Sequence, residues 1–353
     1  MKTGIIIAYT GSPASTHPDD IERYLQQFLM DDRIRQMPKP FWKNLMFKHV
    51  LPKRKFSSAK RYEFIWQEYG SPLIHLQQSL ADKVQATFDA RNDDAIVRSA
   101  MSYGVPNIVD VLAELKSAGC ERIVLLPLYP QSAYSPTQAV IDAYKRAVSA
   151  VNWNPPACII DNYHDNPLYI KAIAQAIKQA GYGQRESDRL LLSFHAIPLK
   201  DERAGDTYRA QIAESRELIA RELGIGADKI TIGFQSVFGH NVNAWASPLS
   251  KDILPTWADD DCRVFYGCPG FAIDCLETLY DIPNEIVPAL EGEEAGKPTA
   301  TVADTKGDLQ AAINSDRFVW LPTLNDSQTQ VELACDVLDA HIDAGEFKPV
   351  KPL

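Results

Sequence analysis

The sequence predicts an α/β fold with two doubly wound parallel sheets. Short apolar runs alternate along the whole chain with longer segments of helical periodicity, which is the pattern of strands joined by crossover helices. Several of the runs are apolar throughout, as in residues 190–192, and this is typical of strands covered by helices on both faces. A length of 353 residues is enough for two domains, each with its own core.

Composition and charge limit the classes of function. Hydrophobic residues make up 45% of the chain and charged residues 23%, which is typical of a globular protein. A net charge of −10 argues against a general nucleic-acid-binding protein. No apolar run approaches the roughly 20 residues that cross a bilayer, and the apolar stretch at residues 5–8 is too short for a signal peptide. We therefore expect a cytoplasmic protein whose first strand begins near Gly4.

The first half of the chain predicts three strands and the helices between them. The strands cover residues 4–8, 95–101 and 122–128, and the helices cover residues 21–29, 72–88 and 108–117. Residues 28–55 are unusual because an aromatic stretch at 41–47 precedes the basic cluster Lys53–Lys55. Two interpretations stay open for this segment, which we call the apolar lip: a surface for a flat apolar anion or a membrane face, or a helix docked on its own domain.

The second half repeats the same alternation after a linker expected near residues 153–156, where two prolines are adjacent. The predicted elements are strands at 157–160, 190–195, 229–235, 263–266 and 317–321, and helices at 167–179, at 208–223, following residues 268–271 and running through Glu277, and at 327–344. The expected domains are therefore 1–153 and 154–322, with a C-terminal helix and tail, 323–353, that pack back on the first domain.

His195 follows the apolar run 190–194, where a parallel strand ends. Ligands of open α/β sheets gather beyond the carboxyl ends of the strands, so His195 is a candidate catalytic residue. The alternative is a core histidine whose ring is hydrogen-bonded to a backbone carbonyl.

Three acids, Glu277, Asp281 and Glu285, are spaced four residues apart and would form one row on a helix. Such a row of like charges is either a solvated face or a set of carboxylates that handles a cation or a proton. Pro283 lies within the row and would distort a regular helix there.

Several common enzyme motifs are absent from the sequence. It contains no Gly-x-Gly-x-x-Gly after the first strand, no phosphate-binding Gly-x-x-x-x-Gly-Lys-Ser/Thr, no Gly-x-Ser-x-Gly and no His-Glu-x-x-His. The six cysteines are scattered without a Cys-x-x-Cys pair, which predicts reduced, buried thiols rather than disulfides, structural zinc or an iron–sulfur cluster.

Taken together, the motifs resemble those of the ferrochelatases, which insert ferrous iron into a porphyrin during haem synthesis. The resemblance runs almost end to end, and the histidine and Cys-Pro-Gly-Phe segments are its most specific parts. It rests on residues 11–13, 70–72, 101–104, 127–131, 191–198, 205–208, 234–236, 268–271 and 274–279.

The resemblance implies two Rossmann-like domains with four-stranded parallel sheets on either side of a porphyrin cleft. It implies that His195 and Glu277 are catalytic and face each other across this cleft, and that Asp281 and Glu285 join them in handling the metal. The residues that it implies for substrate binding are Thr10, Ser71, Tyr103, Gln131 and Ser132.

The same resemblance implies a lyase with no obligatory cofactor, in which Fe²⁺ is a substrate. The iron–sulfur cluster of some members is not expected, because it needs a cysteine arrangement that this chain lacks. The expected partners are Fe²⁺ and a porphyrin, with protoporphyrin IX favoured and coproporphyrin left open, and no nucleic acid. A monomer or a homodimer is compatible with the sequence, and so is transient peripheral contact with the inner membrane.

The chain departs from the family pattern at several positions. Ala196 follows the histidine where glycine is usual, Val237 replaces the arginine of Phe-Gln-Ser-Arg-Phe-Gly, the loop at 243–246 differs, and Thr10 stands where Leu, Met or Tyr is usual. Two alternatives therefore stay open. One is a non-catalytic porphyrin- or haem-binding paralogue, and the other is a sibling chelatase for cobalt or nickel.

Overall fold

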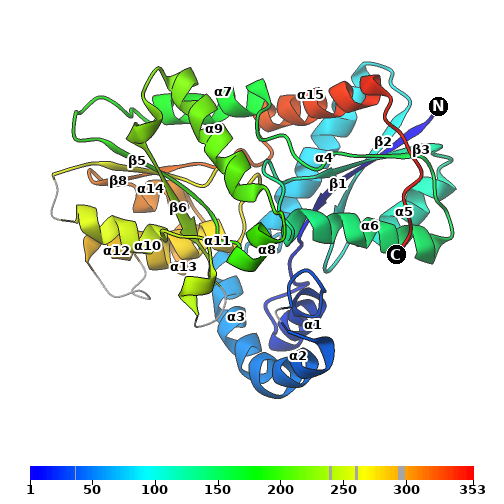
Figure 1. Ribbon diagram of the computed structural model, residues 1–353, viewed down its shortest axis with the longest axis horizontal. Helices are drawn as coiled ribbons and strands as arrows, with labels where there is room; N and C mark the ends of the chain where they lie inside the picture. The colour runs from blue at the N-terminus through cyan, green and yellow to red at the C-terminus, as the bar shows by residue number, and fades with distance from the viewer. Residues whose placement is uncertain (36, 238–240, 259–260, 293–298) are drawn as a thin grey trace. The chain divides into compact units, whose positions relative to one another are not determined.

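In a computed structural model of the chain, the predicted alternation of strands and helices forms two compact units. The structure describes residues 1–35, 37–237, 241–258, 261–292 and 299–353. The first unit comprises residues 1–162 together with 325–353, and the second comprises residues 163–324. Each unit contains one four-stranded, all-parallel sheet with helices packed around it, so the predicted α/β class is confirmed (Figure 1). Across the described residues, no helix is both long and apolar enough to span a bilayer.

The first sheet has the strand order β2-β1-β3-β4. Its central strand is apolar on both faces, and Ile5, Ile6 and Ile7 are fully buried, as expected of a strand covered on both sides. The four strands are β1 (Thr3–Tyr9), β2 (Ala95–Met101), β3 (Arg122–Pro127) and β4 (Ala157–Ile159).

Helices that connect these strands complete the first unit, and a helix from the end of the chain joins them. They are α1 (Pro18–Leu29), α4 (Pro72–Ala90), α5 (Ile108–Ser117), α6 (Pro136–Val151) and α15 (Gln328–Ala344). Helix α15 packs against α4, and Lys83 and Ser79 of α4 bond to Asp326 just before it. Residues far apart in sequence thus share one core.

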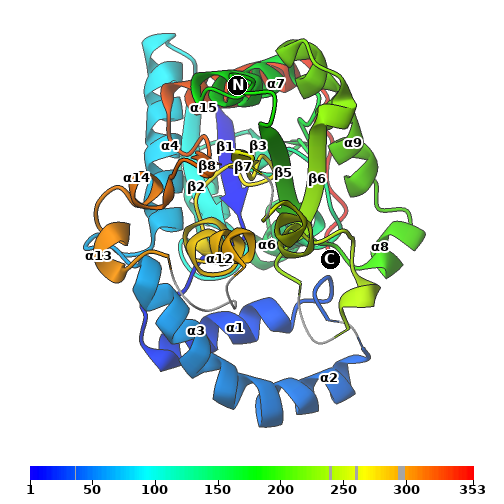
Figure 2. The same ribbon diagram turned by 90° about the vertical axis from the view of Figure 1, so that its left-hand side faces the viewer.

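The apolar lip of the sequence (residues 28–55) forms part of a helical extension of the first unit. It contains α2 (Lys39–Leu45), a π-helical turn η1 (Met46–Val50) and the start of α3 (Leu51–Ile65), which packs against α1. Figure 2 shows α1, α2 and α3 grouped beyond the carboxyl end of β1.

One face of this extension is docked and another is exposed. Trp42 is buried, and its indole N–H donates to the carbonyl of Leu29 over 2.6 Å. Phe41, Phe47 and Phe56 are exposed. The segment is therefore docked on its own unit, as one interpretation proposed, and it also presents aromatic side chains outward, as the other required.

The second sheet repeats the topology of the first, with the order β6-β5-β7-β8. All of its neighbouring strands are parallel, and His195 at the end of β5 pairs with Gln235 at the end of β6. The strands are β5 (Arg189–His195), β6 (Ile230–Gln235), β7 (Val264–Gly267) and β8 (Phe318–Leu321).

Two long helices and several short ones surround the second sheet. The long ones, α7 (Pro167–Gln179) and α9 (Tyr208–Leu223), pack against each other. The short α-helices are α8 (Leu199–Arg203), α10 (Ser250–Ile253), α11 (Leu276–Leu279), α12 (Val287–Glu291), α13 (Val302–Thr305) and α14 (Leu309–Ile313). The 3₁₀ turns are η2 (Ala227–Lys229), η3 (Val242–Ala244) and η4 (Leu254–Trp257), and η5 (Ile282–Ile286) is a π-helical turn.

Helix α6 was not predicted from the sequence, and two predicted element boundaries also differ. The strand at 157–159 was expected to open the second domain, but it pairs with β3, so the division between units falls after Asn162 rather than near residue 154. The helix expected after residues 268–271 begins only at Leu276, because the turns continue to Cys275, which is the N-cap of α11. In both cases the strands and helices exist but the pairing or the start point differs.

Candidate active site

His195 lies at the carboxyl end of β5, as the sequence predicts, and is half-buried. Its Nδ1 is 2.7 Å from the carbonyl oxygen of Ala196. Because a carbonyl oxygen only accepts hydrogen bonds, Nδ1 carries a proton, and in the neutral form of the ring the lone pair lies on Nε2. Within the described residues, Nε2 has no hydrogen-bond partner. The backbone contact of the core-histidine alternative is therefore present, and it leaves Nε2 available as a base or a ligand.

A buried glutamine, Gln235, links the end of β5 to the carboxylate segment. Its side-chain Oε1 accepts from the hydroxyls of Ser193 (2.8 Å) and Tyr266 (2.7 Å), and its Nε2 donates to the backbone carbonyl of Glu277 (2.9 Å). The thiol of Cys268 also donates to Oε1, over 3.4 Å. We call these contacts the Gln235 network. Because they join β5, β6, β7 and α11, they fix the position of the Glu277 backbone relative to the strand that carries His195.

The three acids predicted as one row lie on two consecutive short segments. Glu277 is in α11 and half-buried, Asp281 directly precedes the π-helical turn η5 and is buried, and Glu285 lies within η5. A π-helical turn closes i→i+5 hydrogen bonds, so the four-residue spacing does not produce the regular row that was predicted. Pro283 stands in the first turn of η5, where its missing N–H costs nothing.

Strand β6 connects two of these acids to the histidine. Ser236, which follows Gln235, donates its hydroxyl to Asp281 Oδ2 over 3.0 Å. Its backbone is left-handed, with φ of +63°, and this conformation costs a serine roughly 1–2 kcal/mol. Glu277 is thus bonded through its backbone to Gln235, the pairing partner of His195, and Asp281 is bonded to the next residue, Ser236, whereas Glu285 lies further along the segment.

All six cysteines are buried with free thiols, as predicted. Burial raises the pKa of Cys268 and that of Cys275 well above the ordinary thiol range. Both therefore stay protonated at neutral pH, which makes them poor metal ligands compared with the imidazole and carboxylates nearby.

The other set of predicted residues lies at the carboxyl edge of the first sheet. Thr10 follows β1, Tyr103 follows β2, and Gln131 and Ser132 follow β3, while Ser71 caps α4. The backbone N–H of Tyr103 donates to the Thr10 carbonyl over 3.0 Å. The structure therefore brings the ends of β1 and β2 together, as the parallel register requires.

Side chains of this first edge are largely occupied by one another. The Ser71 hydroxyl donates to the hydroxyl of Ser12 over 2.8 Å, and the hydroxyls of Thr10 and Tyr129 share a short hydrogen bond. Tyr103 and Gln131 are buried, and burial raises the pKa of the Tyr103 phenol, which stays neutral. The predicted residues of the first edge are therefore polar but uncharged, and the nearby carboxylate of Asp31 also raises the pKa of the Tyr103 phenol and is paired with Arg146.

Sequence reasoning missed the Gln235 network. Its signal is a glutamine at the end of the otherwise apolar run 230–234. A buried amide needs partners for both its donor and its acceptor, so such a glutamine indicates a polar network. Of the two departures nearest the site, Ala196 is buried and supplies the carbonyl that binds His195, and Val237 is half-buried. The family-motif positions Phe238 and Gly239 lie outside the described residues.

Two parallel-sheet units with an imidazole and carboxylates at one carboxyl edge define a class of α/β proteins suited to handling a metal ion and protons. The same fold occurs in solved chelatases. The Bacillus subtilis SirB structure with Fe³⁺ has a TM-score of 0.55 at 11% identity, covering 99% of this chain and 100% of that one. The sirohydrochlorin chelatase SirB of B. subtilis subspecies spizizenii in complex with cobalt has a TM-score of 0.51 at 11% identity, covering 98% and 99%.

Sequence comparison resolves the family. The Ferrochelatase family model matches residues 2–315. The ferrochelatase of Nitrosococcus oceani is 31% identical over 342 residues, covering 97% of this chain and 87% of its own length. The ferrochelatase of Haemophilus influenzae is 37% identical over 285 residues, covering 80% and 87%. The chain belongs to the ferrochelatase family, which supports a role as a metal chelatase in haem synthesis.

Proposed function

We propose that this chain inserts Fe²⁺ into a porphyrin, with protoporphyrin IX as the expected acceptor, in a lyase reaction that uses no cofactor. The observation that carries this proposal is the state of His195, whose Nδ1–H is bonded to Ala196 while Nε2 keeps a lone pair. Family membership supports the reaction class, and this geometry supports His195 as the base.

The reaction requires two proton removals. A free-base porphyrin carries two pyrrole N–H groups, and both protons must leave as Fe²⁺ becomes bound to the four ring nitrogens. His195 Nε2 accepts one pyrrole proton as general base, and the Nδ1–H bond to the Ala196 carbonyl stabilises the resulting imidazolium. Release of that proton to solvent water restores the base, which then accepts the second. Such a positioned base contributes typically 10²- to 10⁴-fold in rate.

The carboxylates act on the iron. Oxygen ligands bind Fe²⁺ with moderate affinity, so Glu277 can replace part of its water shell and release it to the ring nitrogens. Asp281 and Glu285 extend this carboxylate segment and supply the iron to Glu277. The Gln235 network keeps the backbone of Glu277 in place while its side chain exchanges ligands.

The first edge has the complementary task. The side chains assigned here are neutral, and the hydroxyls of Ser71 and Thr10 are hydrogen-bonded within the edge, so these residues can contact a flat ring without desolvating a charge of their own. Thr10, Ser71, Tyr103, Gln131 and Ser132 are the residues we assign to ring binding. Contact with the large apolar ring face supplies binding energy that offsets the strain of puckering it.

The test is a metal-insertion assay with the purified chain under anaerobic conditions. Fe²⁺ is supplied with protoporphyrin IX and with coproporphyrin in turn, and loss of the free-base absorption bands is followed. We expect insertion with at least one porphyrin, and a rate at least about a hundredfold lower in the His195→Ala variant. Tight porphyrin or haem binding without insertion would instead indicate the binding paralogue that the Val237 departure favours, and turnover only with Co²⁺ or Ni²⁺ would indicate a sibling chelatase.

A further inference from the structure

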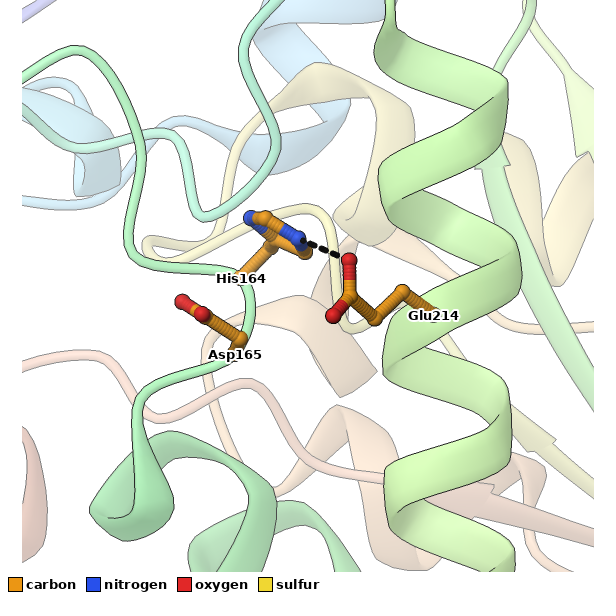
Figure 3. A group of neighbouring side chains, drawn as sticks. All are labelled: His164, Asp165 and Glu214. Atoms are coloured by element: carbon orange, nitrogen blue, oxygen red, sulfur yellow. Dashed lines mark hydrogen bonds and ion pairs between the residues drawn. The ribbon is translucent and has the colours of Figure 1, made fainter.

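A second group of metal-ligating side chains lies in the second unit, on residues that the proposed reaction does not use. His164 and Asp165 stand in the loop before α7, and Glu214 is on α9. His164 Nε2 is 3.1 Å from Glu214 Oε2. One ligand atom from each of the three residues lies within 4.8 Å of those of the other two, and among the described residues this is the group with that property (Figure 3).

The backbone around this group is held in place. The hydroxyl of Ser215, next to Glu214, donates to the carbonyl oxygen of His164 over 2.9 Å. Asn166 caps α7, with its side-chain oxygen accepting from the Leu168 N–H over 2.8 Å. Because the loop and α9 are fixed to each other, the three side chains meet without ordering a mobile segment, which lowers the cost of binding a ligand.

Burial and exposure are divided in a way that suits a metal site. The His164 side chain is 10% exposed, whereas that of Glu214 is 59% exposed and Asp165 is also exposed. The imidazole therefore has a fixed direction, and the carboxylates are open to ions from solvent. Figure 3 shows Glu214 reaching from α9 to the ring edge and Asp165 on the adjacent loop.

The donor types indicate the kind of ion. One imidazole nitrogen and two carboxylate oxygens suit first-row divalent cations, whereas Ca²⁺ and Mg²⁺ prefer oxygen ligands alone. Donor atoms that bind one ion at about 2.0–2.2 Å lie closer to one another than the 4.8 Å within which these three atoms are found. Rotation of the exposed side chains of Asp165 and Glu214 would bring their oxygens closer to the imidazole. Water would fill the remaining coordination positions, so the bound ion stays exchangeable.

We propose that His164, Asp165 and Glu214 form a binding site for a divalent first-row cation such as Zn²⁺ or Co²⁺. The bound ion joins the loop before α7 to α9 and so stabilises the second unit. An ion pair between His164 and Glu214 alone is the competing explanation, and it differs because it needs neither Asp165 nor a metal. The proposal does not depend on the assignment of His195 and Glu277.

Cobalt titration tests this site. Co²⁺ is added to the full chain carrying His195→Ala and Glu277→Gln, so that the candidate active site does not contribute, and binding is followed by visible absorption. We expect one Co²⁺ per chain, displaced by Zn²⁺, with affinity at least tenfold weaker after His164→Ala or Asp165→Asn. The matched control is Glu217→Gln, which removes an exposed acid from the same helix and leaves the affinity unchanged.

A second measurement keeps the result clear if a variant folds poorly. Crystals of the unmodified chain soaked in Co²⁺ should show an anomalous-scattering peak within bonding distance of His164 Nε2. In addition, Co²⁺ should raise the Tm of the chain carrying His195→Ala and Glu277→Gln, but not the Tm of the same chain with Asp165→Asn added. No binding up to millimolar Co²⁺, an unchanged affinity in Asp165→Asn, or a peak elsewhere without one at His164 would overturn the proposal.

Discussion

The carboxyl edges of the two sheets share one strand order but are built differently. In the first sheet, backbone hydrogen bonds join the segments that follow β1 and β2. The N–H groups of Ser102 and Tyr103 donate to the carbonyls of Tyr9 and Thr10, and Gly11 lies against Tyr103. In the second sheet, a side chain joins the strand ends, because the Gln235 network connects three strands and α11. The comparison shows that a shared topology places an edge, while the residues at the strand ends decide its chemistry.

The two edges also differ in charge. The described side chains of the first edge that we assign to the ring are hydroxyls, a phenol and an amide, whereas the second edge has an imidazole and carboxylates. On the proposed function, the first binds the ring and the second exchanges protons and iron. Substitutions at the two edges should therefore affect different kinetic constants.

The largest effect is expected at the charged edge. Replacing His195 with alanine removes the base and should lower kcat for metal insertion by about 10²- to 10⁴-fold. Ser71→Ala, the matched change at the uncharged edge, should change kcat less than tenfold and act mainly on KM. Steady-state kinetics with circular dichroism as a folding control measures both. Equal losses of kcat in the two variants would remove the division of tasks.

A substitution at the opposite, amino end of the second sheet should lower stability without changing kcat. Asp188 lies just before β5, and its carboxylate is bound by the Arg263 guanidinium over 3.0 Å. Burial by itself raises the pKa of Asp188, but bonds from Arg263 and the backbone of Arg185 and Gly183 outweigh it and hold that pKa below its usual value. Asp188→Asn should lower the unfolding free energy by about 3–5 kcal/mol and leave kcat of the folded fraction unchanged.

This ion pair also gives a signed pH dependence. Because the pKa of Asp188 is lower in the folded state, its stabilisation is present above the unfolded-state pKa and is lost as the pH falls through the folded-state value. Urea unfolding between pH 7 and pH 3 should therefore show a shallower acid decline in Asp188→Asn than in the unmodified chain. Parallel declines would contradict the assignment.

At the first edge, replacing a glycine that lies close to another backbone segment should lower the stability of the fold. A Cβ on Gly11 would lie 1.9 Å from the Tyr103 carbonyl oxygen, and its φ is +109°. Gly11→Ala should lower the unfolding free energy by about 2–4 kcal/mol. Gly119→Ala is the control, since its φ is +77° but its Cβ meets open space, and it should cost about 1 kcal/mol. Similar losses in both would mean that the close contact is unimportant.

The smallest effect concerns the Gln235 network itself. Gln235→Leu leaves the Tyr266 hydroxyl without its acceptor, while the Ser193 hydroxyl keeps that of Ser250 over 2.7 Å, and the change should cost about 2 kcal/mol of stability. Because Glu277 loses its backbone anchor, kcat should fall about tenfold with little change in KM for the porphyrin. Gln211→Leu on α9 is the control and should change neither. A stability loss with unchanged kcat would show that the network is structural only.

The sequence predicts all eight strands that the described residues form, because strands buried on both faces are marked by apolar runs. It does not show that the strand at 157–159 belongs to the first sheet, since strand pairing depends on contacts distant in sequence. Nor does it show the π-helical turns at 46–50 and 282–286. The second of these turns replaces the regular helical periodicity that was assumed for the acidic row.

For the candidate site, His195 is found at its predicted strand end because the end of an apolar run is a local signal. The tautomer of His195 and the role of Gln235 are not local, because they depend on a carbonyl direction and on three strands meeting. The His164 group likewise joins a loop to a helix fifty residues away. Such features need coordinates.

The most direct measurement is the initial rate of Fe²⁺ insertion into protoporphyrin IX by the unmodified chain and by Glu277→Gln, followed anaerobically by loss of the free-base bands. The account predicts turnover in the first and a loss of at least about a hundredfold in kcat in the second, with porphyrin binding retained. Full turnover in Glu277→Gln, or porphyrin binding with no insertion by the unmodified chain, would contradict it.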